Sequence, residues 1–321
     1  MVVTYADVAK RAGTSTAVVS YVLNDGPRNV APATRERVLT AAAELGYRQN
    51  RIARALRSGR TGLVGVLTPD ATIPYFGELT RAIVRALGDA DRFALVSHAA
   101  VSGRSERQAI EALLSAQVDG LLITAFWPDQ ELPVEIDVPV VYVHHKPDGV
   151  EGLLVESDNT HSVRAAVEHL RSHGHGAPAF WAGPDDVGPT GERTRAWAAL
   201  VGDDGTLYRS GYSSGEAAAE FRRQHRLGTP ARSLVVASDV QALGILSAAY
   251  QLGVRIPDDL AVISLDGSAE TAFTAPPLTV VRQPVESMAA RAVGLLTGRP
   301  DAGESLGSLI VRTSCGCDHD V

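Results

Sequence analysis

The sequence of 321 residues contains only two cysteines and no long hydrophobic run. Cys315 and Cys317 are too few for a disulfide framework, which favours a reducing compartment. The longest apolar stretches have the length of strands, which excludes a membrane-spanning helix. The first residues, MVVTYADVAK, show no basic stretch followed by an apolar run, so we expect no export signal and a cytoplasmic protein.

The length and the charge distribution both indicate that the chain has more than one domain. One hydrophobic core rarely serves more than about 250–300 residues, so at least two domains are expected. The net charge is −7, yet the first 60 residues carry ten Lys or Arg and only four Asp or Glu. They are therefore +6, and the remaining 261 residues are −13. A basic head on an acidic body predicts a polyanion-binding module joined to another domain, although a solvated charged face is the alternative.

Residues 1–48 have the pattern of a small helical domain. Thr4 and Asp7 stand in capping-box spacing at the start of the first helix, and Gly13 ends it. Ser15 can cap the second helix. The expected helices cover residues 4–12, 16–23 and 32–45.

The spacing between the first two helices predicts a helix-turn-helix. Ala9, Gly13 and Val19 follow one another at intervals of four and six residues. Two helices that cross sharply need a small residue at their contact, Gly where φ is positive, and a branched apolar residue toward the core. The second helix would enter the major groove with Thr16 and Ala17 facing base edges. An ordinary three-helix bundle uses the same residues, so that alternative stays open.

Residues 49–60 are expected to form a short hinge helix or a basic linker. Asn50 can cap a helix that ends near Gly59, but eight residues are too few for a stable isolated helix. The arginines of this segment repel one another unless a polyanion is present. A helix here therefore depends on a partner, and a plain basic linker is the alternative.

After residue 60 short apolar strands alternate with helices. Such alternation predicts parallel sheets covered by helices on both faces, here two sheets that form two lobes. In this architecture a ligand binds at the carboxyl ends of the strands. The expected strands are 63–67, 93–98, 120–126, 138–143, 179–183, 233–238, 260–266 and 278–283, and the expected helices are 77–88, 104–116, 160–173, 215–226, 239–252 and 285–297.

Polar and aromatic side chains follow the ends of these predicted strands. Carboxylates accept hydrogen bonds from neighbouring hydroxyls, arginine donates them, and aromatic rings cover apolar C–H faces, so the set suits a polyhydroxylated ligand. Any single aspartate at a strand end could instead cap a helix. The candidate effector-binding residues are Tyr75, Phe76, Trp127, Asp158, Arg193, Ser238, Asp239 and Asp266.

The runs VTYADVAKRAGTSTAVVSYVLN and TRERVLTAAAELGYRQNRIARALRSGRTGLVGVL resemble the lac/gal repressor (LacI/GalR) family, and the resemblance extends over the whole chain. It implies a helix-turn-helix DNA-binding domain over residues 1–48 and a hinge helix over 49–60 that forms on the operator. It also implies a homodimeric, periplasmic-binding-protein-like core over 61–321 that binds the effector. We place the crossings between its lobes near residues 157, 284 and 311. The N-lobe is then about 61–157 and 285–311, and the C-lobe about 158–284 and 312–321.

The resemblance also implies which residues contact DNA. In the family the leucine of the hinge helix is wedged into the minor groove at the operator centre, which here is Leu56 and agrees with apolar wedges at kinked base steps. Tyr21 stands where many relatives carry Arg, so their operator sequence does not transfer to this chain. The candidate DNA-binding residues are Thr4, Tyr5, Ser15, Thr16, Ala17, Ser20, Tyr21, Asn24, Arg28, Asn50, Arg51, Ala53, Arg54 and Leu56.

Three departures from the family concern the ligand site. Gly267 replaces the second acid of a usual pair, and Ala196 replaces a usual Gly. The stretch from Trp197 to Gly211 is shorter than in most relatives and apparently lacks part of a helix and a strand. A regulator that has lost its effector response therefore stays an alternative.

Together these features predict a sequence-specific transcriptional repressor, not an enzyme. We expect a homodimer on a pseudo-palindromic DNA duplex, controlled by a sugar or similar polyol bound between the lobes. A solute-binding protein would explain residues 61–321 but neither the basic head nor the missing export signal. A sugar- or nucleoside-processing enzyme would need a catalytic constellation, and none is visible.

Two small groups of metal-ligating residues occur near one helix end and near the C-terminus. His169, His173 and His175 lie close in sequence, and members of the family carry His at the first and last of these places without a metal. Cys315 and Cys317 supply only two ligands. We therefore expect neither group to bind a metal, and no cofactor.

Overall fold

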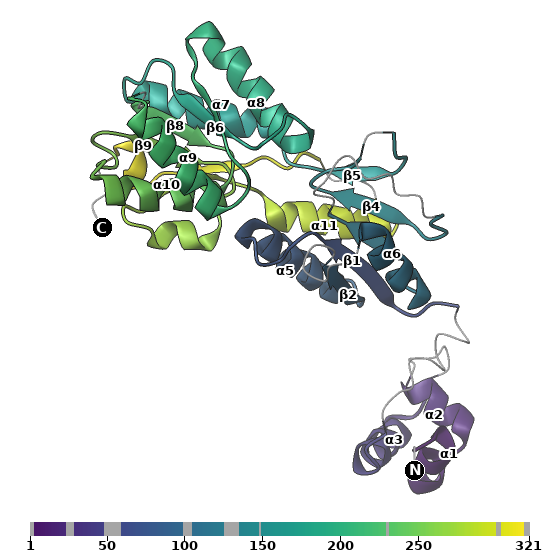
Figure 1. Ribbon diagram of the computed structural model, residues 1–321. Helices are drawn as coiled ribbons and strands as arrows, with labels where there is room; N and C mark the ends of the chain where they lie inside the picture. Colours follow the sequence, from purple (N-terminus) through teal and green to yellow (C-terminus); the bar gives the residue numbers. More distant parts are fainter. Residues whose placement is uncertain are drawn as a thin grey trace. The chain divides into compact units, whose positions relative to one another are not determined.

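The structure, a computed structural model, describes residues 3–23, 29–47, 59–98, 105–124, 135–147, 149–228, 231–299 and 303–317. The chain forms two compact units, Met1–Thr61 and Gly62–Val321 (Figure 1). Eight predicted site residues lie outside the described ranges: Asn24, Arg28, Asn50, Arg51, Ala53, Arg54, Leu56 and Trp127.

The smaller unit contains the three expected helices, α1 (Tyr5–Ala12), α2 (Thr16–Leu23) and α3 (Pro32–Glu44). Gly13 ends α1 with a φ of +63°, and its N–H donates to the Ala9 carbonyl. Ala9 and Val19 are buried, as the predicted spacing requires, and pack with Val38 of α3. The helix-turn-helix prediction is therefore confirmed at the level of the fold.

The first lobe of the larger unit is a five-stranded parallel sheet with the order β2-β1-β3-β4-β5. Helices α5 and α11 pack side by side on one face, where Leu79, Ile83 and Met288 join the core (Figure 1). Ile110 and Leu113 of α6 cover the other face. The strands are β1 (Leu63–Thr68), β2 (Phe93–His98), β3 (Leu121–Ile123), β4 (Val140–Val143) and β5 (Leu153–Val155), and the helices are α5 (Pro74–Asp89), α6 (Glu106–Ser115) and α11 (Val285–Leu296).

The second lobe is a six-stranded sheet with the order β11-β10-β9-β8-β6-β7, in which β11 is the antiparallel strand. Val163 and Trp197 of α7 and α8 cover one face, and Ala217 and Ile245 of α9 and α10 cover the other. The strands are β6 (Ala179–Ala182), β7 (Leu207–Arg209), β8 (Ser233–Val236), β9 (Ala261–Ser264), β10 (Thr279–Arg282) and β11 (Ser308–Ile310). The helices are α7 (Asn159–Ser172), α8 (Gly188–Val201), α9 (Ser214–Arg226) and α10 (Asp239–Leu252), with 3-10 turns η1 (Gly202–Asp204), η2 (Ala269–Phe273) and η3 (Thr313–Cys315).

The chain changes lobes between β5 and α7, between β10 and α11, and again after α11. The last change precedes the position predicted near residue 311. Ile310 pairs with Val280 of β10, so Ser308–Ile310 belongs to the second sheet. Placing residues up to 311 in the N-lobe is therefore wrong, because an edge strand of three residues is too short to leave a periodic pattern.

The segment after Trp197 keeps both elements that the sequence analysis considered incomplete. Helix α8 continues to Val201, and β7 follows after η1 and pairs in parallel with β6. The short connection therefore completes the sheet. Within the described ranges no helix combines the length and the apolarity needed to cross a bilayer.

Candidate functional site

The start of α2 presents the residues predicted to read DNA. Thr16 and Ala17 are exposed, and Ser20 and Tyr21 are half-buried. The Ser15 hydroxyl accepts a backbone N–H of the first turn at 3.3 Å. An exposed helix start with small side chains can enter the major groove and offer N–H groups to phosphates. Contact of these residues with bases stays a prediction.

Thr4 and Tyr5 already have partners within the helical unit. The backbone N–H and the hydroxyl of Thr4 both donate to the Asp7 carboxylate, at 2.9 and 2.7 Å. These bonds hold the pKa of Asp7 below its usual range. The Tyr5 ring packs against Tyr47 with the ring centroids 5.5 Å apart. Both residues therefore shape the start of α1, whether or not they touch DNA.

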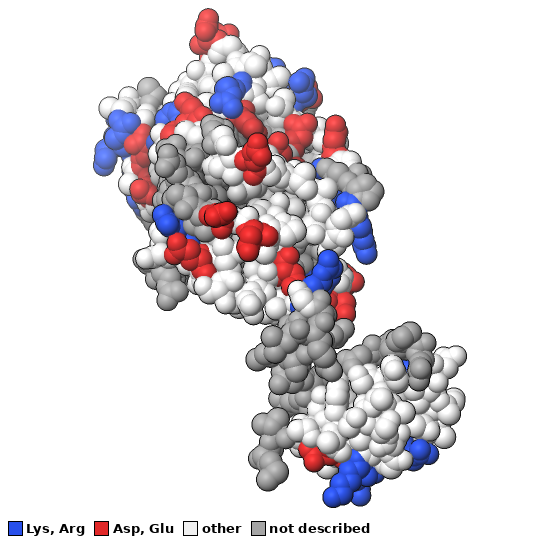
Figure 2. Space-filling model, turned by 90° about the vertical axis from the view of Figure 1, so that its right-hand side faces the viewer, with Lys and Arg blue, Asp and Glu red and all other residues white. Residues whose placement is uncertain are grey.

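Most of the positive charge of the head belongs to the part that the structure does not describe. The described residues of the smaller unit hold five Lys or Arg and three acids, net +2 of the +6. Arg11 among them pairs with Glu44 at 2.7 Å. Figure 2 shows acidic side chains spread over the visible face of the larger unit. Attraction for a polyanion therefore resides in the head and its linker.

Arg193 is the centre of a buried polar cluster in the second lobe. It projects from α8, and its side chain is 6% exposed. Its Nε donates to Asn159 Oδ1 at 2.8 Å, and its Nη1 donates to Asp266 Oδ1 at 3.2 Å and to the Ala237 carbonyl. The cluster therefore joins the start of α7 to the residues that follow β8 and β9, at the carboxyl ends of those strands.

The remaining guanidinium nitrogen of Arg193 has no hydrogen-bond partner among the residues that the structure describes. Nη2 is buried and makes no hydrogen bond to any described residue. Leaving a buried donor unsatisfied costs about 1–3 kcal/mol. Native proteins rarely accept that cost without a reason such as a bound ligand or water. Among the described residues, Arg193 therefore keeps one buried N–H group that is available to a further acceptor.

Asp266 titrates close to neutral pH. Burial raises the pKa of its carboxyl to about 6, the charge of Arg193 opposes the rise, and the charge of Asp239 adds to it. Its second oxygen accepts the backbone N–H of Asp239 at 3.2 Å. The group is therefore largely ionised at pH 7, when it can accept hydrogen bonds from ligand hydroxyls, and becomes neutral in mild acid.

The first lobe contributes a group of rings. Tyr75 and Phe76 begin α5 and are both buried, with ring centroids 5.1 Å apart. The Tyr75 hydroxyl and His144 Nδ1 form a hydrogen bond of 2.9 Å. Burial raises the pKa of Tyr75, Asp266 raises it further and Arg193 lowers it. The rings of one lobe therefore lie within electrostatic range of the charged pair of the other.

His144 lies beside these rings, although the sequence analysis did not assign it to the site. It follows β4 with a φ of +77° and contacts both rings of α5. Burial lowers the pKa of its imidazole to about 3, and the charges of Arg193 and His145 lower it too. His144 is therefore neutral at physiological pH and can exchange hydrogen bonds with hydroxyl groups.

Asp158 caps a helix, which is the alternative that the sequence analysis gave for a single aspartate at a strand end. Its exposed carboxylate caps α7 by accepting the backbone N–H of His161 at 2.7 Å. The buried neighbour Asn159 reaches the cluster instead, where its amide also donates to Glu192 at 2.8 Å. The side chain that joins Arg193 is therefore that of Asn159, and effector binding by Asp158 stays a prediction.

Ser238 and Asp239 also have internal partners. Asp239 is 2% exposed. Its carboxylate accepts three hydrogen bonds, from the Ser264 hydroxyl at 2.5 Å and from the N–H and hydroxyl of Ser268 at 2.6 and 2.7 Å. The Ser238 hydroxyl donates to Gln241 at 3.0 Å. Because these bonds occupy the polar groups, we assign both residues to positioning rather than to ligand contact.

Tyr212 is a member of the cluster that sequence reasoning missed. Its hydroxyl hydrogen-bonds Thr190 of α8. Burial raises the pKa of Tyr212, while Thr190 and the charge of Arg193 oppose the rise. The residue follows β7, directly after the stretch from Trp197 to Gly211 in which the sequence analysis expected no strand, so no strand end indicated it.

Gly267 has a conformational reason for its place after Asp266. Its φ is +75°, and a Cβ atom there would lie 2.5 Å from Arg282 Cα. A side chain would therefore need both a strained backbone and displacement of a neighbouring strand. The absence of a second acid at this position agrees with the local backbone.

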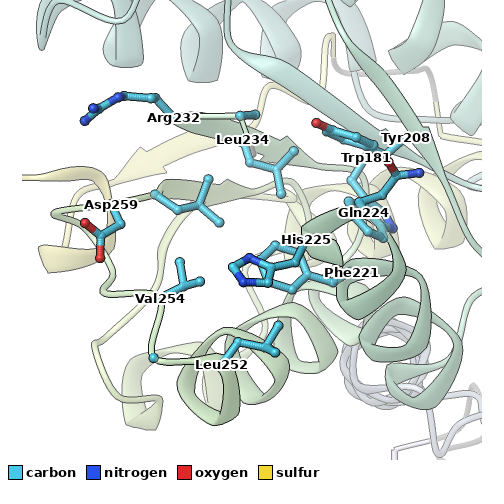
Figure 3. A pocket seen from close by; sticks show the side chains of 13 residues that line it. Trp181, Tyr208, Phe221, Gln224, His225, Arg232, Leu234, Leu252, Val254 and Asp259 are labelled. Atoms are coloured by element: carbon cyan, nitrogen blue, oxygen red, sulfur yellow. The ribbon is translucent and has the colours of Figure 1, made fainter. Parts of the chain in front are cut away.

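A pocket of about 380 Å³ lies elsewhere in the second lobe (Figure 3). Trp181, Phe221 and Val254 line it, with Arg232 and Leu260 at the amino ends of β8 and β9. Ligands of parallel α/β sheets bind at the carboxyl ends, where Arg193 and Asp266 lie. None of the predicted effector-binding residues is among those that line this pocket, so we do not assign it to the effector.

Two family descriptions match separate parts of the chain. Residues 4–50 match "Bacterial regulatory proteins, lacI family", and residues 167–315 match "Periplasmic binding protein-like domain". The chain is 32% identical to the ribose operon repressor of Halalkalibacterium halodurans, over 91% of this chain and 89% of that protein. It is 34% identical to the HTH-type transcriptional regulator MalR of Streptomyces coelicolor, over 91% and 88%.

Solved structures agree with these matches. The lac repressor dimer bound to operator and the anti-inducer ONPF has a TM-score of 0.82 and 26% identity, and the match covers 98% of this chain and 99% of that one. A complex of the transcriptional regulator CelR with cellobiose has a TM-score of 0.69 and 29% identity, covering 97% and 99%. The similarity therefore includes both the helical unit and the two-lobed unit.

Proposed function

The chain belongs to the lacI family of bacterial regulatory proteins, and from this premise we propose that it is a transcriptional repressor whose operator affinity is controlled by a polyhydroxylated ligand. DNA binding resides in residues 1–60. The ligand binds between the two lobes of the larger unit.

The observation that carries the ligand proposal is the buried guanidinium of Arg193, whose Nη2 has no partner within the described part of the chain. A hydroxyl oxygen of the ligand can accept a hydrogen bond from Nη2. The same hydroxyl, or a vicinal one, can donate a hydrogen bond to the Asp266 carboxylate. Tyr75 and Phe76 offer apolar faces to the C–H side of a ring, as sugar sites require. Neutral His144 can donate or accept beside them.

The names of two similar proteins support a carbohydrate. One is a ribose operon repressor, and the other was solved with cellobiose. We therefore propose a sugar of one or two rings as the effector class.

The DNA partner follows from the helical unit and its charge. One helix-turn-helix covers half a site, so a homodimer on a pseudo-palindromic duplex gives each head equivalent contacts. The similar lac repressor structure is a dimer bound to operator. Thr16 and Ala17 are the side chains that we propose to approach base edges.

Isothermal titration of full-length protein with a panel of monosaccharides, disaccharides and nucleosides tests the ligand site. For the ligand that binds most tightly, Arg193→Lys should reduce affinity about 10- to 100-fold, because lysine keeps the charge but loses the fixed donor fork, and a charged hydrogen bond contributes about 1.5–3 kcal/mol. Arg195→Lys, exposed on the same helix, should bind like the wild type. Equal losses in both variants, or no loss in Arg193→Lys, would contradict the assignment.

A further inference from the structure

The two groups of metal-ligating residues that the sequence analysis considered separately meet in the structure. His169 and His173 are one helical turn apart near the end of α7. Cys315 ends η3, and Cys317 follows two residues later. One ligand atom from each of the four residues lies within 4.8 Å of all the others. Two imidazoles and two thiols are thus gathered in the second lobe, away from the Arg193 cluster.

The distances between these atoms resemble those around a tetrahedral ion. His169 Nε2 lies 3.2 Å from Cys315 Sγ and 3.6 Å from Cys317 Sγ, and His173 Nε2 lies 3.1 Å from Cys317 Sγ. In a tetrahedral zinc site, with Zn–S about 2.3 Å and Zn–N about 2.0 Å, a nitrogen and a sulfur ligand are about 3.6 Å apart. Three pairs of ligand atoms are therefore already about as close as in a zinc site, and the other pairs lie within 4.8 Å.

The chain holds the thiols at this place by ordinary packing. Cys315 is fully buried, and its Sγ accepts the Thr279 hydroxyl at 3.1 Å and donates to the Arg312 carbonyl at 3.2 Å. Gly316 has a φ of +96°, a conformation that other residues rarely adopt, and this turn brings Cys317 back toward α7. Neither cysteine is in a disulfide. His173 is exposed, which leaves a path for an ion.

We propose that His169, His173, Cys315 and Cys317 form a zinc site. A set of two thiolates and two imidazoles in tetrahedral arrangement selects Zn²⁺ among the common divalent ions. Binding deprotonates both thiols and releases two protons to solvent while Zn²⁺ keeps its charge and oxidation state. The ion fastens the segment after β11 to the end of α7, the helix whose first residue, Asn159, bonds to Arg193.

Metal titration of the full chain tests the site. Protein reduced with a phosphine and freed of metal with a chelator is titrated with Co²⁺, whose visible d–d bands and thiolate charge-transfer band report tetrahedral sulfur coordination. Zn²⁺ is then added in competition. We expect one Co²⁺ per chain with both spectral features, displaced by one equivalent of Zn²⁺.

The variants are chosen among the more accessible ligands, because Cys315 also packs in the core. Cys317→Ser and His173→Gln should each lower Zn²⁺ affinity by at least about 100-fold, since loss of even an outer partner of a ligand costs 10- to 100-fold. His175→Gln, a neighbouring histidine outside the group, should bind as the wild type does. Circular dichroism of each variant checks that the fold is kept.

Three outcomes would overturn the proposal. The first is no stoichiometric uptake of Co²⁺ or Zn²⁺ by the reduced wild type. The second is bound Co²⁺ without the thiolate band. The third is unchanged Zn²⁺ affinity in folded Cys317→Ser and His173→Gln.

Discussion

Asp266 should make the stability of the second lobe depend on pH in a direction opposite to that of most carboxylates. Its pKa in the folded protein is about 6, raised by burial from an ordinary 3.8. The unfolded chain ionises first, so this group contributes stability that is fully present below about pH 3.8 and is lost as the pH rises through 6. The whole loss is about 3 kcal/mol at 1.36 kcal/mol per pKa unit.

The Asp266→Asn variant isolates this effect, because asparagine keeps the shape and one acceptor oxygen but does not titrate. Between pH 4.5 and 7 the unfolding free energy of Asp266→Asn should increase relative to the wild type by about 2 kcal/mol, the part of the loss that falls in this interval. This relative increase in unfolding free energy with pH is expected even if loss of the Arg193 ion pair lowers the stability of the variant by a constant amount.

Urea unfolding at several pH values measures the difference. Tryptophan fluorescence suits the assay, because Trp181 and Trp197 are buried in the two cores of the second lobe. Asp258→Asn is the control, since Asp258 is 62% exposed and should show no such trend. A flat difference between wild type and Asp266→Asn from pH 4.5 to 7, or a difference of opposite slope, would refute the reasoning.

Three further predictions concern the backbone, the head and the linker. Gly267→Ala should destabilise the second lobe by about 1–3 kcal/mol more than Gly253→Ala in thermal or urea unfolding, because both glycines have a positive φ but only Gly267 would place a Cβ against a neighbouring strand. Affinity for a cognate duplex should fall steeply with salt, with a log–log slope of about −0.9 per neutralised phosphate, and residues 61–321 alone should not bind it; retained binding by that fragment would contradict the assignment of the head. Leu56→Ala, outside the described residues, should weaken binding to the specific site much more than to scrambled duplex at one salt concentration, and equal losses on both would mean that residue 56 lies in a plain linker.

The helical unit and the alternation of strands and helices were predictable because their signals are local. Gly13 needed a positive φ, and the buried Ala9 and Val19 stand at the spacing that two crossing helices require. Most strands of both sheets are short apolar runs bounded by turns. Such a run can be recognised within a window of a few residues. The elements that were missed, α8, β5, β7 and β11, either lack a strong apolar period or are strands of three residues at a sheet edge.

The site was predicted only in part. Arg193 and Asp266 could be named because a polar residue after a strand lies at the ligand-binding edge of an α/β sheet. The sequence did not predict which of two adjacent polar residues would reach the buried cluster. Asp158 caps a helix while Asn159 reaches Arg193, and the carboxylate of Asp239 is taken by Ser264 and Ser268, because hydrogen bonds are assigned by side chains that approach from other elements.

The sequence by itself determined most of the elements, their order and the class of the protein, since caps, turns and hydrophobic periods act within a few residues. The tertiary structure decided which distant groups share an environment. The raised pKa of Asp266 exists only because folding removes its carboxyl from water beside Asp239. Likewise His169 meets Cys315 across 146 residues, because α7 and the segment after β11 pack against the same sheet. Two histidines of α7 and its end and two cysteines near the C-terminus come together as one group only when the chain has folded.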